Sequence, residues 1–216
     1  MKRELITLSV GEPKSFNWKG KDERSGIGKN VVSRAELLKS GFKNDGVANL
    51  DFHGGPDRAV CAYPFEHYSL WEAEFGRVFT PPAFGENICI TNMKEDQVYI
   101  GDTFSLGETI IQVTQGRVPC STISKFNQED KLLSRILETG FTGYFFRVLQ
   151  EGVITQEDTE LVLVDRPQEK VTVLYANQIM FHDRKNVEGI RAILEVEPLA
   201  EVWRDNLNKM LSKIVE

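Results

Sequence analysis

The segment Val113–Thr122 (VTQGRVPCST) places a cysteine in a setting that suits a reactive or metal-ligating thiol. A core cysteine usually lies within an apolar run, whereas Cys120 follows a proline and precedes two hydroxyl residues. A thiolate persists at neutral pH beside positive charge, which Arg117 can supply, and a helical turn starting at Ser121 would add backbone N–H groups. Pro119 restricts the backbone just before the thiol. The pattern predicts either a functional thiol or a loop cysteine without a role.

A second group of polar residues precedes a predicted strand, in the segment 49–64 (NLDFHGGPDRAVCAYP). Its ionisable side chains surround a Gly-Gly-Pro turn: Asp51, His53, Asp57 and Arg58. Adjacent glycines let the backbone approach a ligand closely. The segment predicts either a ligand-binding loop at a strand end or a tight turn that these side chains cap. His67, four residues before Trp71, is interpreted as a packing or surface histidine.

The cysteines do not form a framework of their own. There are three of them, no two are close in sequence, and the apolar run at the start is too short for a signal peptide, so we expect no disulfides. The histidines are scattered and no CxxC pair occurs, so we expect no structural zinc site. Cys61 and Cys89 lie in apolar strands and are interpreted as structural, which leaves Cys120 as the candidate for chemistry.

The elements that must position these residues are mostly strands. Short segments rich in β-branched and aromatic residues predict eight of them: Glu4–Val10, Ala59–Pro64, Glu86–Thr91, Gln97–Ile100, Thr103–Leu106, Thr109–Gln115, Tyr144–Gln150 and Glu160–Asp165. Close spacing and tight glycine turns favour an antiparallel sheet that closes, or nearly closes, as a barrel. We expect Glu86 and Asn87 to line the same end of this barrel. The polar, glycine-rich segment Phe16–Asn30 is predicted to be an exposed loop.

Two helices interrupt the strands. Apolar residues at helical spacing predict them over Pro64–Phe75 and Gln128–Gly140. The first 166 residues are therefore predicted to be mainly β, with these two helices inserted between strands.

The residue pattern changes from strand-like to helical after the last predicted strand. The segment RPQEK (166–170) is typical of a linker, so we place a boundary between residues 1–166 and 167–216 and expect few contacts to cross it. Three short helices fit the second part. Thr172 and Asn186 are the predicted N-caps of the first two, and Pro198 is predicted in the first turn of the third.

The bulk composition excludes several classes. The chain has 216 residues, of which 41% are hydrophobic and 27% charged, and its net charge of −6 argues against a general nucleic-acid or anionic-membrane binder. No apolar run is long enough to span a bilayer, so we expect a cytoplasmic protein. Residues 167–216 carry seven basic and eight acidic side chains, which does not favour a DNA-reading helix-turn-helix.

Four motifs, in this order, resemble a MOSC domain, the module at the C-terminus of molybdenum cofactor sulfurases. They are FHGGPDRAVCAYP, FGENI, VYIGDTFSLG and VTQGRVPCSTI. The resemblance covers about Leu5 to Asp165. The tail from Val171 resembles the small three-helix domain that follows MOSC in one bacterial subgroup. Each motif alone is weak, but the ordered set with the tail is specific.

The resemblance implies a β-barrel-like fold whose cysteine handles molybdenum or sulfur. In the related amidoxime-reducing component the matching cysteine ligates the molybdenum of a pterin cofactor, and here that residue is Cys120. The flanking side chains are expected to hold the pterin and its phosphate, since a guanidinium binds phosphate through paired hydrogen bonds. The implied cofactor-binding residues are Thr114, Gln115, Arg117 and Ser121, together with His53, Asp57, Arg58 and Asn87.

This sequence departs from the family pattern at two positions. Gly116 stands where the family commonly has a proline, which could loosen the loop. Cys61 stands where an aromatic residue or histidine is more common. The second thiol is either accidental or able to resolve a sulfur intermediate. Neither departure removes the expected ligand.

The leading interpretation is an enzyme, a molybdenum-dependent oxidoreductase. It binds the molybdenum cofactor (molybdopterin) and reduces small N-hydroxylated compounds, such as hydroxylaminopurines or amidoximes. Because no Rossmann or flavin fingerprint occurs, electrons are expected from a separate redox protein. The alternatives are a persulfide (sulfur) carrier for metal–sulfur or cofactor assembly and a non-catalytic ligand-binding module. The tail is expected to dock either the electron donor or a second copy of the chain, as in a homodimer, and we expect no nucleic-acid or membrane partner.

Overall fold

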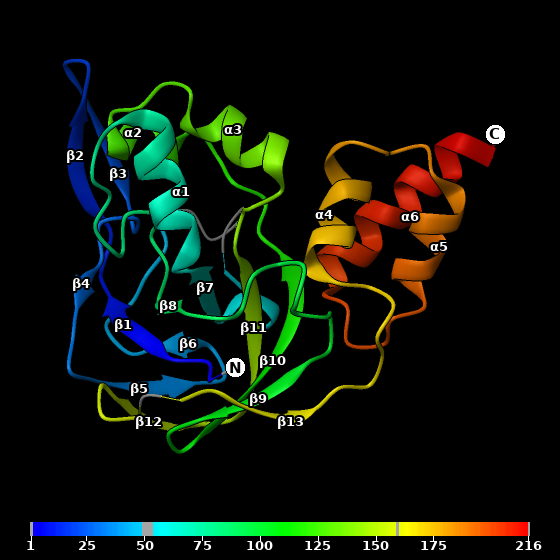
Figure 1. Ribbon diagram of the computed structural model, residues 1–216, viewed down its shortest axis with the longest axis horizontal. Helices are drawn as coiled ribbons and strands as arrows, with labels where there is room; N and C mark the ends of the chain where they lie inside the picture. The colour runs from blue at the N-terminus through cyan, green and yellow to red at the C-terminus, as the bar shows by residue number, and fades with distance from the viewer. Residues whose placement is uncertain (1, 49–53, 159, 216) are drawn as a thin grey trace.

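A large curled sheet forms the body of the protein in this computed structural model, which describes residues 2–48, 54–158 and 160–215 (Figure 1). Its eight strands lie in the order β13-β9-β10-β11-β7-β8-β1-β4. Their bounds are β1 Leu5–Val10, β4 Asn30–Val31, β7 Val60–Pro64, β8 Ile88–Ile90, β9 Thr103–Leu106, β10 Thr109–Gly116, β11 Tyr144–Gln150 and β13 Val162–Asp165. Every neighbouring pair is antiparallel except β7 and β8.

The two ends of the sheet come together. Glu4, just before β1, forms an isolated bridge with Glu160, just before β13, and the Leu161 N–H donates to the Arg3 carbonyl at 3.0 Å. The sheet is therefore strongly curled and forms a half-barrel rather than a flat layer. The predicted fold class, mainly β and barrel-like with inserted helices and a three-helix tail, is confirmed.

Two small sheets accompany the main one. Strand β5 (Arg34–Leu38) lies between β12 (Gly152–Thr155) and β6 (Gly41–Phe42), while β2 (Lys14–Trp18) pairs with β3 (Lys21–Ser25) as a hairpin. These strands were not among those predicted from the sequence.

The prediction of an exposed loop over Phe16–Asn30 is therefore wrong. Lys19 and Gly20 both have positive φ, 49° and 82°, which matches the tight hairpin turn that joins twisted strands. In β2, Phe16 and Trp18 alternate with polar residues, and Phe16 packs edge-on against Phe126, but β3 is entirely polar and gave no strand signal.

The predicted strand Gln97–Ile100 is also wrong: the Gln97 N–H closes one turn on the Lys94 carbonyl (2.9 Å), Tyr99 forms only an isolated bridge with Thr172, and the Asp102 N–H closes a second turn on the Tyr99 carbonyl (3.0 Å).

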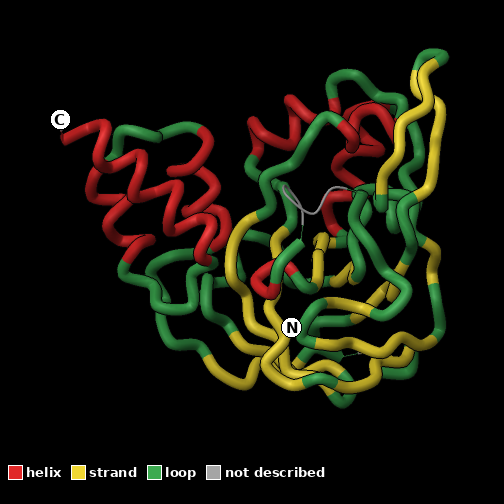
Figure 2. The backbone as a smooth tube through the Cα atoms, turned by 180° about the vertical axis from the view of Figure 1, so that it is seen from behind, coloured by secondary structure: helices red, strands yellow, loops and turns green. Residues whose placement is uncertain are grey.

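Helices cover one end of the barrel. They are α1 (Glu66–Phe75), α2 (Thr122–Asn127) and α3 (Leu132–Thr139), with a short 3₁₀ turn, η1 (Pro56–Arg58), before β7. Figures 1 and 2 show the first three grouped beside the β2–β3 hairpin. Both predicted helices exist, and the second is split from a separate helix α2 by a left-handed residue, Gln128 (φ 51°).

The tail folds as the three predicted helices: α4 (Val173–Phe181), α5 (Val187–Leu194) and α6 (Glu201–Val215). Thr172 accepts from the Tyr175 N–H at 3.0 Å and Asn186 accepts from the Gly189 N–H at 2.8 Å, so both predicted N-caps are confirmed. Pro198 lies in a turn before α6, not in its first turn. The free N–H of Glu201 instead meets the carboxylate of Asp57 at 3.0 Å, which fixes where the helix begins.

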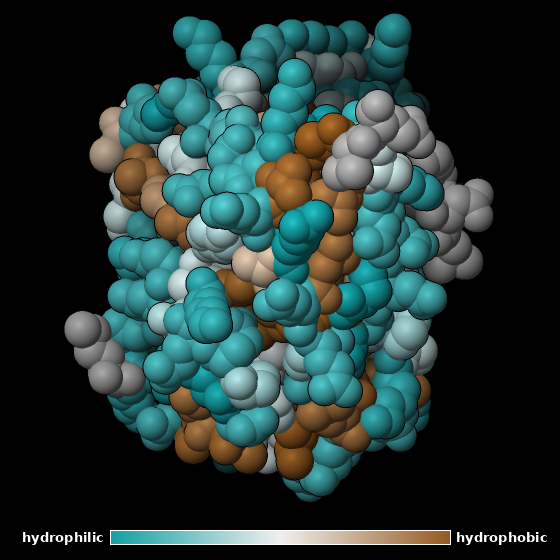
Figure 3. All heavy atoms as spheres, turned by 90° about the vertical axis from the view of Figure 1, so that its right-hand side faces the viewer, coloured by the Kyte–Doolittle hydropathy of each residue, from teal (hydrophilic) through white to brown (hydrophobic). Residues whose placement is uncertain are grey.

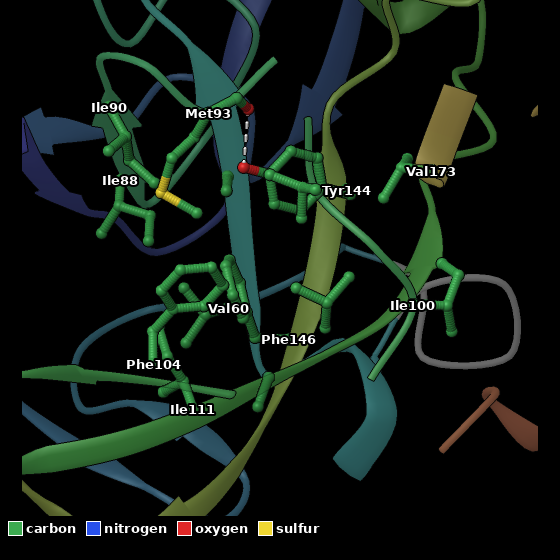
Figure 4. Close-up of a cluster of buried hydrophobic side chains, with 14 of the residues drawn as sticks. Val60, Ile88, Ile90, Met93, Ile100, Phe104, Ile111, Tyr144, Phe146 and Val173 are labelled. Carbon is green, nitrogen blue, oxygen red and sulfur yellow. Dashed lines mark hydrogen bonds between the residues drawn. The ribbon is translucent and has the colours of Figure 1, made fainter. Parts of the chain in front are cut away.

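One hydrophobic core runs through the barrel and the tail. Figure 4 shows Val173 of α4 among core side chains of the sheet, and Trp203 and Leu207 of α6 belong to the same cluster. The linker is also fixed, since Arg166 forms a bidentate pair with the buried Asp102 at 2.8 and 2.7 Å. The expectation that few contacts cross the linker is therefore wrong. The polar sequence of the linker indicates that one side of it is exposed to solvent, but it does not predict the contacts that its other side makes with the protein.

Within the residues described here, no helix combines the length and the apolar character needed to cross a lipid bilayer.

Candidate functional site

The Cys120 loop, residues 117–121, leaves the end of β10 and leads directly into α2. The Arg117 N–H donates to the Gly143 carbonyl at 3.0 Å, and the Cys120 carbonyl accepts from the Ile123 N–H at 3.2 Å. The helical turn expected after Ser121 is therefore present. Cys120 is partly exposed, whereas Cys61 and Cys89 are buried, as their apolar strands predicted. The loop thus brings one thiol of the three to the surface.

The guanidinium of Arg117 is held by backbone rather than by a carboxylate. Its Nη1 donates to the Phe84 carbonyl at 2.6 Å, and Arg117 makes no ion pair within the described part of the chain. Phe84 is itself fixed, because its ring stacks on Tyr63 with the ring centroids 4.2 Å apart. The charge of Arg117 is therefore positioned but not neutralised by a paired anion.

Glu86 lies fully buried near Arg117. Its carboxylate accepts hydrogen bonds from the Tyr68 hydroxyl and from the Phe84 N–H (3.1 Å). Burial raises the pKa of Glu86, and the hydrogen bond from Tyr68 and the charge of Arg117 offset this in part. Both carboxylate oxygens are occupied by protein donors, so Glu86 supports the segment that holds Arg117.

Asn87 joins three parts of the barrel and is 3% exposed. Its Oδ1 accepts from the Cys61 N–H at 3.0 Å, and its Nδ2 donates to the Ser9 carbonyl at 3.2 Å and to Asp45 at 2.9 Å. Asp45 also forms an almost buried ion pair with Lys29. Sequence reasoning did not identify this pair, since its two residues lie 16 positions apart in a polar segment without a motif.

The polar residues at the end of β10 differ in which of their hydrogen-bonding groups already have partners within the protein. Thr114 is fully buried and its hydroxyl lies 2.6 Å from the Asp57 carbonyl and 3.1 Å from the Phe145 carbonyl, so its proton is committed to backbone. Gln115 donates through Nε2 to the Gly116 carbonyl at 3.1 Å. Its Oε1 is buried and has no donor among the described residues.

The residues expected from the Gly-Gly-Pro segment are placed unequally. Asp57 accepts from Arg147 at 3.0 and 2.8 Å and from the Glu201 N–H at 3.0 Å, so it ties η1 to β11 and to α6. Burial lowers the pKa of Arg58, and the neighbouring Asp57 offsets this in part. His53 lies outside the described residues.

Gly116 has a packing explanation. A Cβ at this position would lie 1.9 Å from Oδ1 of Asn177, a buried α4 residue. Asn177 is held there by its Nδ2, which donates to the Gly140 carbonyl at 2.8 Å and to the Thr142 hydroxyl at 3.0 Å. A proline ring cannot share this space with the asparagine. The tail therefore reaches the base of the Cys120 loop, which sequence reasoning missed.

His67 is a packing residue, as interpreted from the sequence. It is 2% exposed, its Nε2 lies 2.6 Å from Glu95, and its ring stacks on Phe141 with the centroids 4.3 Å apart.

The Cys120 loop meets three requirements of an anionic pterin cofactor. It offers a partly exposed thiol at Cys120 and, at Arg117, a cation that forms no ion pair with a described residue; Gln115 at the end of β10 adds a buried acceptor that has no donor among the described residues. Ser121 is exposed, and its side chain caps nothing in α2. Such a set suits a ligand that carries phosphate, N–H donors and a centre with affinity for thiolate.

Comparisons with known proteins identify the family of both parts of the chain. The MOSC domain profile matches residues 49–159, and the profile of the YiiM-like 3-alpha helix domain matches residues 171–213. YflK of Bacillus subtilis is 38% identical over 219 residues, covering 100% of this chain and 99% of its own. The crystal structure of YiiM from Geobacillus stearothermophilus is 35% identical, with a TM-score of 0.81 over 97% of this chain and 99% of that one.

A third relative has a different organisation. A protein named reductase from Gibberella moniliformis is 36% identical over 137 residues, which are 59% of this chain and 23% of that protein. The match with the MOSC profile spans more than half of the chain, and YflK matches along its whole length. This chain belongs to the MOSC domain family.

Proposed function

We propose that this protein binds the molybdenum cofactor at the Cys120 loop and reduces small N-hydroxylated compounds. The observation that carries the proposal is that one loop, fixed by backbone hydrogen bonds, holds both a partly exposed Cys120 and Arg117, which forms no ion pair with a described residue. The similarity to a fungal reductase supports a redox role for the same region. When bound, the cofactor supplies two-electron redox chemistry.

Residues of the loop and of the neighbouring segments have different parts in this proposal. Cys120 Sγ holds the metal centre, Arg117 holds the phosphate, and Gln115 Oε1 accepts from an N–H of the pterin. The neighbouring Phe84 carbonyl keeps the guanidinium in place. Thr114 and Asn87 act indirectly, because their hydrogen bonds are already made within the protein.

The overall reaction is balanced by two electrons and two protons. An N-hydroxylated compound R–NHOH takes up both and yields the amine R–NH₂ and one water, so the N–O bond breaks while one N–H bond and one O–H bond form. The electrons come from a separate reduced flavin or iron–sulfur protein. The protons come from solvent, to which the Cys120 loop is open.

The test is substrate reduction by protein produced in a host with intact cofactor synthesis. Reduced methyl viologen serves as the electron source, and chromatography measures the conversion of 6-hydroxylaminopurine or benzamidoxime to the amine or amidine. We expect turnover by the wild type and its loss in Cys120→Ser. The matched control is Cys61→Ala, at a buried thiol, which should retain turnover.

Two results contradict the proposal. The first is cofactor-loaded protein that reduces neither compound. The second is full activity in Cys120→Ser. A metal-free protein whose Cys120 carries cyanide-releasable sulfur would instead support the persulfide carrier.

A further inference from the structure

A groove of about 420 Å³ lies between the Cys120 loop and the tail. Val118 lines it from the loop, two residues before Cys120, while Met180 of α4 and Met210 of α6 line it from the tail. Val118 is 53% exposed although it is apolar. Figure 3 shows the molecule from the side of the tail, where apolar patches are bordered by hydrophilic side chains.

Three cations line the same groove: Arg184, which follows α4, and Lys209 and Lys213 of α6. All three are exposed, and none forms an ion pair with a described residue. The described lining contains no carboxylate. The groove is therefore positive in a chain whose net charge is −6.

We propose that this groove is the docking surface for an acidic electron-donor protein of the flavin or iron–sulfur class. Its carboxylates would meet Arg184, Lys209 and Lys213, and its apolar contact would be with Val118. A donor seated there touches the loop that carries Cys120. This proposal rests on the proposed reductase function, because it names the protein that delivers the two electrons.

Charge decides between the possible occupants. A symmetric dimer places the same patch of each copy against the other, so a dimer through this groove would bring three cations against three cations. An acidic partner instead neutralises them. Unpaired surface charges also speed association by steering and make it sensitive to salt. Electron-transfer complexes are commonly small and transient, which suits one open groove.

The experiment compares protein and dye donors on the cofactor-loaded full chain. Reduced acidic flavodoxin and reduced acidic plant-type ferredoxin are the protein probes, and reduced methyl viologen is the dye. The variant is the double charge reversal Lys209→Glu/Lys213→Glu. The control is Lys170→Glu/Arg191→Glu, which changes the net charge equally at two exposed tail positions that do not line the groove. Reoxidation of the donor is followed in a single turnover at low and high ionic strength.

We expect at least one protein donor to react with the wild type at a rate that falls with salt. That rate should drop at least about tenfold in the groove variant and change little in the control. The dye should drive all three proteins equally, and circular dichroism should show unchanged helix content.

Four outcomes overturn the proposal: an unchanged rate in the groove variant, an equal loss in the control, no reaction with either protein donor, or a dimer that the groove variant dissociates. The last result assigns the groove to a second copy. If the dye also fails to drive the wild type, the reductase function itself is wrong, so the two failures are distinguishable.

Discussion

Cys120 differs from the other cysteines in its surroundings, and this difference is measurable. Cys61 is 6% exposed and Cys89 is fully buried. Burial raises the pKa of both thiols, and the nearby Arg117 offsets this in part for Cys61. Cys120 is partly exposed and follows Arg117 by three residues.

We therefore predict that a thiol reagent labels Cys120 first in cofactor-free protein at neutral pH. Cys61 and Cys89 should react slowly, because only the thiolate is nucleophilic and neither side chain is accessible. Mass spectrometry of digested protein measures the order. Equal labelling of the three would contradict a distinct role for the loop, and labelling of Cys120 that cofactor does not suppress would contradict metal ligation.

The charge of Arg117 gives a second prediction. The substitution Arg117→Gln should weaken the affinity for molybdopterin about ten- to a hundredfold, since a charge-assisted hydrogen bond contributes about 1.5–3 kcal/mol. The purified variant should therefore contain less of the cofactor. Fluorescence of the oxidised pterin released from purified protein measures the content. Arg24→Gln, at an exposed position of β3, is the control and should retain the cofactor. Equal pterin in both variants would show that Arg117 does not bind the phosphate.

The sequence motifs selected the candidate residues without showing which of their side chains already have partners inside the protein. The motif that selected Gln115, whose Oε1 has no donor among the described residues, also selected Thr114, and the resemblance added Asn87, although both of these form hydrogen bonds within the protein. A side chain's partners depend on neighbours distant in sequence, as Asn87 shows by contacting Asp45 and Ser9. One sequence does not reveal such pairs.

At the scale of elements, the end of β10 and helix α4 are fitted to each other. The Gly116 backbone leaves only enough space for Oδ1 of Asn177. We predict that Gly116→Ala destabilises the fold by about 1–3 kcal/mol, because the added methyl must displace the asparagine. Chemical denaturation measures the change.

A double-mutant cycle isolates this contact. Asn177→Ala removes the clash but also the hydrogen bonds to Gly140 and Thr142, so it is destabilising alone. The loss of unfolding free energy in the double variant should be clearly smaller than the sum of the losses in the two single variants, since the clash is gone. Strict additivity would show that Gly116 is not held to glycine by Asn177.

Strands whose own residues favour β structure were predictable from the sequence. Strands that depend on pairing with a neighbouring strand were not. The strands Thr103–Leu106 and Tyr144–Gln150 were predicted with the bounds they have, because β-branched and aromatic residues mark them. The hairpin of β2 and β3 was missed, because only Phe16 and Trp18 alternate with polar residues in β2 and β3 is entirely polar. The turn at Lys19 and Gly20, both with positive φ, joins its two strands.

At the scale of the whole molecule, barrel and tail share one core and should unfold together. Val173 of α4 is fully buried in that core. We predict a single thermal transition and a loss of about 2 kcal/mol in Val173→Ala, the scale of burying a valine side chain. Val202→Ala on α6, 40% exposed, is the control and should change little. Two separate transitions would contradict the shared core.

The most direct test of the central claim is the molybdenum content of the purified protein. Elemental analysis of wild type, Cys120→Ala and Cys61→Ala, all produced in a host with intact cofactor synthesis, gives the metal per chain. We predict close to one molybdenum per chain in the wild type and in Cys61→Ala, and almost none in Cys120→Ala with the fold retained. Wild-type protein without molybdenum, or Cys120→Ala with undiminished molybdenum, would contradict the assignment of Cys120 as the metal ligand.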